Sequence, residues 1–247
     1  MKFTILHFDN IGSTNDEALR QAGAGAAEGL CIVAKQQTAG RGRHGRSWVS
    51  NQDSGLYFSI VLRPQLDTQF LPLITLMAGV AVHDTLQEFG VGPDIKWVND
   101  VLVGEKKIAG ILAEAADTHA GVAVVVGIGI NVTSANFPDE LAETATSISA
   151  ETERAVTFSE LEQSLTKYLG YFYDILNAAD GPSQILDEWR KRSSYFSGKS
   201  VKVVLPNETF DGVTDGLEST GALRVRTPDG ELKIVNAGDV RRLRAGE

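Results

Sequence analysis

The stretch Gly40-Arg41-Gly42-Arg43-His44-Gly45-Arg46-Ser47-Trp48 places three glycines and three arginines within nine residues. Glycine lets the backbone approach a ligand closely and turn its N–H groups toward it. The arginines add fixed positive charge and bidentate hydrogen-bond donors. We therefore interpret the segment as a site for a phosphate, or for a phosphate and a carboxylate together. The alternative is a solvated basic turn, although so much arginine is unusual in a chain whose net charge is −9.

The residues that follow this segment decide between fold classes. The glycines at 40, 42 and 45 match the dinucleotide-binding fingerprint, but that fingerprint needs a helix that opens inside the motif. Residues 48–55 read instead as a polar loop, so we exclude a dinucleotide-binding fold. We also exclude an RGG-type nucleic-acid tract, because such tracts are longer and occur in basic chains.

Helices and strands are both predicted around the segment. Short apolar runs predict strands over residues 30–34, 56–62, 95–97, 107–114 and 122–132. Helical spacing predicts helices over residues 14–23, 72–89, 157–168 and 183–191. Two of these helices begin with capping-box spacing, Thr14 with Glu17 and Thr157 with Glu160. The pattern is typical of an α+β body.

The composition changes near Gly198. Short β-type segments follow, separated by turn residues, over residues 201–205, 209–217, 223–227 and 232–235. About 50 residues of strand and turn indicate a small β-barrel after the larger body. We predict two domains, residues 1–195 and residues 196–247, with the boundary between Tyr195 and Gly198.

Composition and charge exclude several classes of protein. The chain has 247 residues, of which 43% are hydrophobic and 22% charged, and this is ordinary globular composition. The single Cys31 cannot form an internal disulfide, and the four histidines show no paired metal-ligand spacing. The apolar run from 122 to 130 is about half the length of a membrane helix, and the N-terminus does not resemble a signal peptide. We expect a cytoplasmic protein that does not enter membranes.

A second polar segment lies at 96–100 and continues at 106–114. If Lys107 begins a strand, its ammonium group lies at the end of the sheet, where it could neutralise a carboxylate or a phosphoryl oxygen. Asn99 and Asp100, placed in a turn, could donate or accept hydrogen bonds or hold a metal-bound water. The alternative is an exposed hairpin tip with solvated lysines.

A third segment, Gly127-Ile128-Gly129-Ile130-Asn131, ends the most apolar run of the chain. Glycine inside a strand often marks close approach by a ligand, and Asn131 could then hydrogen-bond an adenine edge. The alternative is a bulge at the end of a strand. The sequence contains neither a nucleophile elbow nor a kinase catalytic loop, which excludes acyl-serine and protein-kinase chemistry.

Five motifs in one order resemble the biotin protein ligases, also called biotin–[acetyl-CoA-carboxylase] ligases. They are Ser13-Thr14-Asn15 and residues 40–46, 96–100, 107–112 and 127–131, and the resemblance covers Ile11 to Leu243. It implies a mixed sheet with flanking helices of the class II synthetase and biotin ligase type, followed by an SH3-like barrel. It also implies that biotin and Mg·ATP form biotinyl-5′-AMP, from which a lysine of a biotin carboxyl carrier protein takes biotin.

The resemblance also implies roles for individual residues. The implied biotin contacts are Ser13, Thr14, Asn15, Gln37, Arg41, Gly42, Arg43 and Lys107. The implied ATP and adenylate contacts are Arg43, Arg46, Trp48, Asn99, Lys107 and Asn131. The implied catalytic residues are Lys107, Arg41, Arg43 and Asp100. Metal ligands are not assigned. The family usually has proline where this chain has Val98, a difference that removes no polar group.

The expected partner is a biotin carboxyl carrier protein, and the expected assembly is a monomer or a ligand-linked homodimer. Some bacterial relatives carry an N-terminal helix-turn-helix, whereas about ten residues precede the first motif here, so we expect no DNA binding at a net charge of −9. Two alternatives stay open. One is a lipoate or octanoate ligase or transferase of the same fold, and the other is a non-catalytic module that binds a cofactor or RNA.

Overall fold

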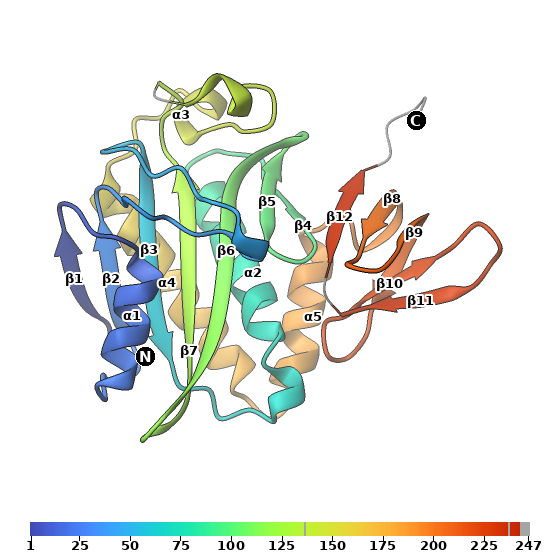
Figure 1. Cartoon of the computed structure of the whole chain (residues 1–247), viewed down its shortest axis with the longest axis horizontal. Helices are drawn as coiled ribbons and strands as arrows, with labels where there is room; N and C mark the ends of the chain where they lie inside the picture. Colours follow the sequence, from blue (N-terminus) through green and yellow to red (C-terminus); the bar gives the residue numbers. More distant parts are fainter. Residues whose placement is uncertain (136, 237, 243–247) are drawn as a thin grey trace.

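The computed structural model describes residues 1–135, 137–236 and 238–242. Two separate sheets organise the chain, a seven-stranded mixed sheet and a five-stranded antiparallel sheet (Figure 1). The larger sheet contains, in spatial order, β1 (Thr4–Phe8), β2 (Leu30–Ala34), β3 (Gly55–Leu62), β7 (Gly121–Asn131), β6 (Lys106–Thr118), β5 (Asp100–Val103) and β4 (Asp94–Lys96). The β1–β2 pair is parallel and the other pairs are antiparallel, so the predicted mixed α+β body is confirmed.

Helices cover both faces of the large sheet. The helices are α1 (Thr14–Gly23), α2 (Leu73–Glu88), α3 (Ile148–Glu151), α4 (Phe158–Leu176) and α5 (Gly181–Lys191). Three short 3-10 turns lie at Arg43–Gly45, Thr68–Phe70 and Asp139–Leu141. Figure 1 shows α2, α4 and α5 behind the sheet, with α1 and the loop that follows β2 crossing its front. The sheet therefore has one face covered by helices and one face shared by α1 and a loop.

Alternation along β7 assigns its side chains to these two faces. The even-numbered residues from 124 to 130 belong to the main core, which also contains the buried side chains of α2 and α4. Ala123 and Val125 pack instead against Ala18 and Ala22 of α1 in a smaller core. Because side chains alternate along a strand, Gly127 and Gly129 continue this second face beyond α1. Along β7, the face toward α1 thus begins with apolar side chains and ends with two glycines.

Helix α2 is the apolar centre of the main core. By length and composition, the helical stretch Thr68–Glu88 is the one candidate for a membrane span in the part of the chain that the structure describes. Its apolar part is 67% buried inside the fold. The apolar composition of this stretch is therefore accounted for by packing against the sheet, α4 and α5.

The smaller sheet follows α5. Its strands are β8 (Ser197–Val204), β9 (Thr209–Leu217), β10 (Leu223–Arg226), β11 (Leu232–Val235) and β12 (Asp239–Arg242), in the spatial order β11-β10-β9-β8-β12. A separate small β-domain at the C-terminus, as predicted, is confirmed. Helix α5 ends at Lys191 and β8 begins at Ser197, and the division at residues 195 and 196 stays a prediction.

The predicted helices and strands are present, but three strands and the four-residue helix α3 were not predicted, and one predicted cap is wrong. Strands β1, β5 and β12 were not predicted, because each is at most five residues long and none is a continuous apolar run. The capping box at Thr14 and Glu17 is wrong. Ser13 is the N-cap, and its hydroxyl accepts a hydrogen bond from the backbone N–H of Asp16 at 3.3 Å. The capping box of Thr157 and Glu160 is confirmed.

The small domain contacts the large one through a turn between β9 and β10. The indole N–H of Trp97 donates to the carbonyl of Gly221 at 2.9 Å, and both residues are buried. A Cβ atom at Gly221 would lie 2.9 Å from Leu73 and Leu76 of α2, so the turn packs closely against that helix. The C-terminal domain therefore fixes Trp97, which lies two residues before the predicted site residue Asn99.

We predict that Trp97→Phe lowers the free energy of unfolding by about 1–3 kcal/mol more than Trp189→Phe does. Both indoles are buried, but among the described residues the N–H of Trp189 has no hydrogen-bond partner. Only the change at Trp97 leaves a buried carbonyl, that of Gly221, unpaired. Chemical denaturation of the two variants measures the difference, and equal losses would show that this hydrogen bond does not stabilise the domain contact.

Candidate active site

Glycines on β6 and β7 leave room for side chains from other segments to lie against the sheet. Gly110 and Gly129 are direct neighbours in the antiparallel register, and Gly127 is opposite Leu112. A Cβ atom at Gly129 would lie 2.4 Å from the ring of Trp48, and one at Gly127 would lie 2.2 Å from Oδ1 of Asn15. The sequence interpretation assigned the close approach at these glycines to a ligand, whereas in the structure the side chains of Asn15 and Trp48 make it.

The first turn of α1 supplies the floor of the site. Ser13, Thr14 and Asn15 are all at most 4% exposed, and Ser13 caps the helix. Thr14 donates twice to Oε1 of Gln37, from its backbone N–H at 2.8 Å and from its hydroxyl at 3.0 Å. The amide N–H₂ of Gln37 donates in turn to the hydroxyl of Ser50 at 2.9 Å. The start of α1 is thus hydrogen-bonded, through Gln37, to the loop that follows β2.

Ser59 of β3 connects these polar groups from below. Its hydroxyl lies 2.6 Å from Oδ1 of Asn15 and 2.8 Å from Oγ1 of Thr14. The amide N–H₂ of Asn15 donates to the carbonyl of Leu112 at 3.2 Å and to the carboxylate of Glu114 at 2.8 Å. Buried amides and hydroxyls joined in this way have fixed orientations, which is what recognition of a small polar head group requires.

The glycine and arginine loop folds back on itself above this floor. Arg41 pairs with Ser47 as an antiparallel bridge, and the backbone N–H of Gly42 donates to the carbonyl of Arg46 at 2.6 Å. A Cβ atom at Gly40 would lie 2.5 Å from the carbonyl oxygen of Trp48. The close approach at Gly40 is therefore to the loop's own backbone, whereas the sequence interpretation assigned it to a ligand.

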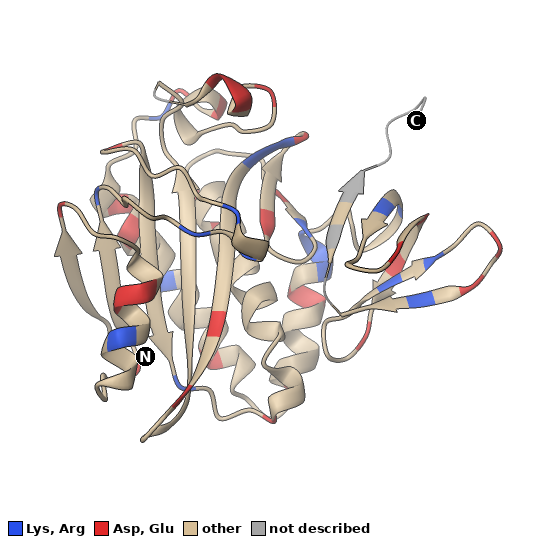
Figure 2. Cartoon of the chain, in the orientation of Figure 1, with Lys and Arg blue, Asp and Glu red and all other residues tan. Residues whose placement is uncertain are grey.

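Arg41 and Arg43 donate to acceptors on the sheet side. Arg41 makes a bidentate pair with Glu114 at 2.7 and 2.9 Å and also contacts Asp16 at 2.7 Å. The hydrogen bonds that Arg41 donates to Glu114 raise the pKa of Arg41 further above its ordinary value. Arg43 donates to Oδ1 of Asn99 at 3.2 Å. Arg46 is exposed and does not line either cavity described below. Figure 2 shows these basic positions on the loop and acidic positions on α1 and β6.

Lys107 forms the electrostatic centre of the site. Its Nζ lies 2.5 Å from Oδ1 of Asp100 and 5.3 Å from the centre of the Trp48 ring. Lys96 contacts the other oxygen of Asp100 at 3.4 Å. Burial alone would raise the pKa of Asp100, but the two ammonium groups outweigh burial and lower it below its ordinary value. Asp100 is therefore a carboxylate at neutral pH, and Lys107 is a paired cation at the sheet end rather than a solvated lysine at a hairpin tip.

The turn before β5 positions Asn99 and Asp100 separately. Asn99 exchanges hydrogen bonds with Ile111, its side-chain amide donating at 3.0 Å and its carbonyl accepting at 2.9 Å. The sequence predicted Asp100 in the turn, but Asp100 is the first residue of β5 and pairs with Gly110 in the register. Pairing with β6 thus brings its carboxylate to Lys107 on the same strand as Gly110.

Asn131 ends β7 beside Lys107. Its N–H₂ group donates to the carbonyl of Thr146 at 2.9 Å and to that of Lys107 at 3.3 Å. These bonds attach residues 144–146 to the start of β6, and the backbone N–H of Lys107 strengthens the attachment by donating to Thr144 at 2.8 Å. Both amide protons of Asn131 are donated to backbone carbonyls, so only its Oδ1 could accept a hydrogen bond from adenine. The adenine contact itself stays a prediction.

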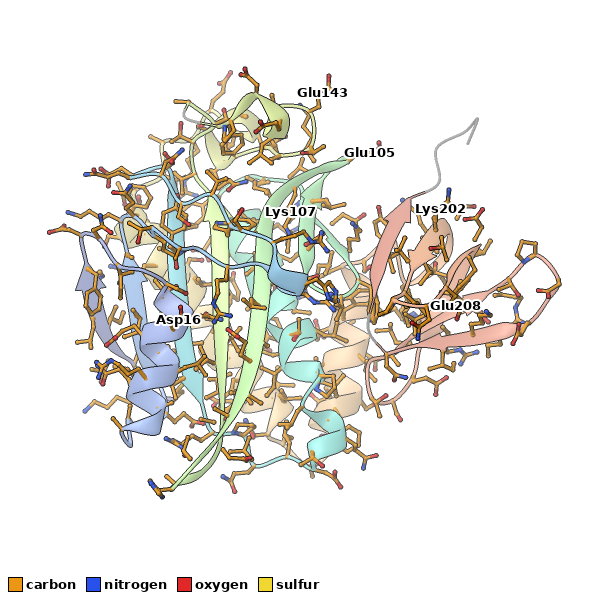
Figure 3. All side chains as sticks on the ribbon, viewed as in Figure 1. Asp16, Glu105, Lys107, Glu143, Lys202 and Glu208 are labelled. Carbon is orange, nitrogen blue, oxygen red and sulfur yellow. The ribbon has the colours of Figure 1, made fainter. Side chains whose placement is uncertain are left out.

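Two cavities meet at Lys107 and Trp48. The inner pocket is lined by all eight predicted biotin contacts, namely Ser13, Thr14, Asn15, Gln37, Arg41, Gly42, Arg43 and Lys107. The outer cavity has a volume of about 1020 Å³ and is lined by Asp100 and Asn131. It extends to Tyr195, just before the small β-domain, and to Lys202 within that domain. Trp48 and Lys107 line both. Figure 3 shows Lys107 on β6 and Lys202 on β8 of the small domain.

Three residues of the site were not predicted from sequence: Asp16, Ser59 and Glu114. Ser59 had a usable signal, since it is a polar residue inside an otherwise apolar predicted strand. Glu114 also had one, because even-numbered residues of β6 share a face with Gly110. Asp16 lies next to predicted site residues, but nothing in its spacing indicates Arg41 as its partner.

Comparison with known proteins agrees with this geometry. Residues 9–131 match the model of the biotin/lipoate A/B protein ligase family, and residues 196–242 match that of the biotin protein ligase C terminal domain. The biotin–[acetyl-CoA-carboxylase] ligase of Mycobacterium tuberculosis is 34% identical over 94% of this chain and 86% of its own length. The chain belongs to the biotin protein ligase family.

Further relatives agree with this assignment. The bifunctional ligase/repressor BirA of Bacillus subtilis is 36% identical, and the match covers 94% of this chain and 72% of that protein. Among solved structures, the biotin protein ligase from Aquifex aeolicus in complex with biotin and ATP superposes with a TM-score of 0.85 at 28% identity. That match covers 97% of this chain and 99% of the Aquifex chain. The similarity therefore extends over both domains.

We predict that Gly127→Ala lowers the free energy of unfolding by about 1–3 kcal/mol, because the new methyl group displaces Asn15 from its bonds to Ser59 and Glu114. Gly92→Ala is the matched control, since no atom lies within 4 Å of a Cβ at Gly92. Chemical denaturation measures both variants. If Gly127→Ala is as stable as Gly92→Ala, the side chain of Asn15 is not held against β7.

Proposed function

We propose that this protein is an ATP-dependent biotin ligase that forms biotinyl-5′-AMP and transfers biotin to a lysine of a biotin carboxyl carrier protein. The observation that carries the proposal is the position of Lys107 and Trp48, which line both an inner polar pocket and the large outer cavity. Two substrates held in the two cavities would meet at a cation. A ligase that joins two anions needs this arrangement.

Biotin is assigned to the inner pocket. Its ureido group needs donors and acceptors in fixed positions, which Thr14, Asn15 and Gln37 provide. Phe58, Leu112 and Ile128 add apolar surface for the ring system and the acyl chain. The carboxylate at the end of that chain would then lie at the open side of the pocket, where Lys107 and Arg43 are placed.

Adenylation follows where the cavities meet. A carboxylate oxygen of biotin attacks the α-phosphorus of ATP, the bond from that phosphorus to the bridging oxygen breaks, and pyrophosphate leaves with the electron pair. Lys107 and Arg43 offset the repulsion between the two anions, and Asn99 orients Arg43. When Lys107 turns toward the phosphate, Asp100 keeps Lys96 as a counter-ion. The indole N–H of Trp48, buried and without a partner among the described residues, is a donor available to the nucleotide.

Transfer of biotin uses the outer cavity. The amine of the carrier lysine attacks the acyl carbon, and AMP leaves with its phosphate oxygen. Asp100 lines this cavity as a carboxylate. Its lowered pKa makes it a weak base, so we assign it to orienting the incoming ammonium group by charge rather than to removing its proton. Loss of the proton to solvent then precedes the attack.

The remaining assignments rest on chemistry and charge. Residues 1–135, 137–236 and 238–242 contain no group of three or more His, Cys, Asp or Glu side chains placed to hold a metal ion. We propose that Mg²⁺ arrives with the phosphates of ATP, the mode in which it keeps several waters. Cytoplasmic location and a state of monomer or ligand-linked homodimer stay proposals. The absence of DNA binding stays a prediction that rests on the net charge of −9.

Isotope exchange between ATP and pyrophosphate tests the first step. Exchange should require biotin and should not occur with lipoate, and mass spectrometry should then detect one added biotinyl group on a carrier domain. Exchange with lipoate but not biotin would assign the chain to the other activity of its family model. Failure of both acids would contradict ligase activity altogether.

We predict that Lys107→Ala lowers the exchange rate by about 10²–10³-fold, the usual loss when one preorganised donor to developing charge is removed. The control is Lys106→Ala, because Lys106 is the exposed neighbour and its ammonium group donates to the carbonyl of Ala142, away from Asp100. The control should exchange at the wild-type rate. Equal rates for the two variants would remove Lys107 from the mechanism.

A further inference from the structure

Glu114 joins two parts of the site without lining it. The residue lies on β6, on the same face as Gly110 and Leu112, and it is outside the set of residues that surround the inner pocket. One carboxylate oxygen accepts from Arg41 at 2.9 Å. The other accepts from Arg41 at 2.7 Å and from Asn15 at 2.8 Å. A single side chain thus holds the glycine and arginine loop and the pocket floor together.

The charge of Arg41 is balanced inside this cluster. Glu114 and Asp16 both lie 2.7 Å from one guanidinium nitrogen, so two carboxylates face one cation. A cation in that position attracts a further anion weakly, because the field of its neighbours opposes the approach. The side chain of Arg41 therefore serves to anchor the start of the loop, and the charge for the substrates comes from Lys107 and Arg43.

The orientation of the Asn15 amide follows from the same carboxylate. A carboxylate only accepts hydrogen bonds, so the N–H₂ group of Asn15 must face Glu114, and its Oδ1 must face Ser59. Asn15 is 4% exposed, which leaves solvent little part in that choice. Glu114 thereby determines which atom of Asn15 is presented toward the pocket.

We propose that Glu114 is a positioning residue that couples closure of the loop over residues 40–48 to recognition of biotin. This inference rests on the proposed function. When the loop is closed, Glu114 fixes Arg41 and the amide of Asn15 together. When Arg41 leaves, Glu114 keeps Asn15 but loses the two hydrogen bonds that fix its carboxylate, and the floor of the pocket loses rigidity. Biotin affinity and loop closure then both depend on the contacts of Glu114.

Three substitutions separate the parts of this contact. Glu114→Gln weakens the contacts with both Asn15 and Arg41. Both residues are donors, and the amide N–H₂ group of the new side chain must face one of them. Asp16→Asn weakens only the anchoring of Arg41 (Figure 3 shows Asp16 on α1). Glu17→Gln is the matched control, since Glu17 pairs with Arg20 on the same helix and does not contact the site.

The measurements are biotin affinity by calorimetry without ATP, and the rate at which preformed biotinyl-5′-AMP leaves the protein. We expect Glu114→Gln to weaken biotin binding about tenfold and to accelerate adenylate release, while KM for ATP stays unchanged. Asp16→Asn should also accelerate release, but it should weaken biotin binding less than Glu114→Gln does, because it keeps the bond between Glu114 and Asn15. Glu17→Gln should match the wild type in both. Thermal unfolding of each variant establishes that the fold is kept.

Contrary outcomes are distinct from a failure of the proposed function. If the wild-type protein shows no biotin-dependent exchange, the ligase assignment fails first. If the wild type is active and Glu114→Gln matches Glu17→Gln in biotin affinity, Glu114 is not a positioning residue. A rise in KM for ATP equal to the loss of biotin affinity would indicate general damage and also overturn the proposal. Should Glu114→Gln not fold, unchanged adenylate release by Asp16→Asn would overturn it.

Discussion

The side chains of Asn15 and Trp48 lie in the space that Cβ atoms would fill at Gly127 and Gly129. The site depends on this constraint: β7 must lack side chains at these two positions so that Asn15 and Trp48 can pack against it. It brings the first turn of α1 and the loop after β2 into contact with the middle of the large sheet. Without it, neither segment could reach β6, where Lys107 and Glu114 reside, and the two cavities would not share a wall.

Paired charges give the site its second feature. The chain is acidic overall, with a net charge of −9, and the basic side chains of the site have carboxylate or amide partners. Lys107 faces Asp100, Arg41 faces Glu114, and Arg43 faces Asn99. Partners of this kind hold cations in place before any ligand binds, which reduces the reorganisation that a reaction between two anions demands. Figure 2 shows basic positions on the loop and acidic positions on α1 and β6.

The sequence was informative wherever a local rule governs the structure. The helix α2 and the strands β2 and β3 follow from periodicity, and the order of motifs placed all eight biotin candidates on one pocket. Local rules failed where partners are distant. Strand β1 is defined by pairing with β2, and Thr14 gives up its capping role because Gln37 and Ser59 engage its hydroxyl.

Glu114 shows the same limit in the site. Its role depends on Arg41, 73 positions away, and on Asn15, 99 positions away, and no spacing within β6 encodes either contact. The glycines of β7 were recognisable as places of close approach, but the approaching groups were not, since a ligand and a tryptophan require the same empty space.

The most direct measurement is a crystal structure of the chain with biotinyl-5′-AMP bound. The account predicts the biotin ring beside Thr14 and Gln37, above the glycines of β7, with the phosphate in hydrogen-bond contact with Nζ of Lys107. An adenylate bound wholly within the outer cavity, with the inner pocket unchanged and Lys107 still on Asp100, would contradict it.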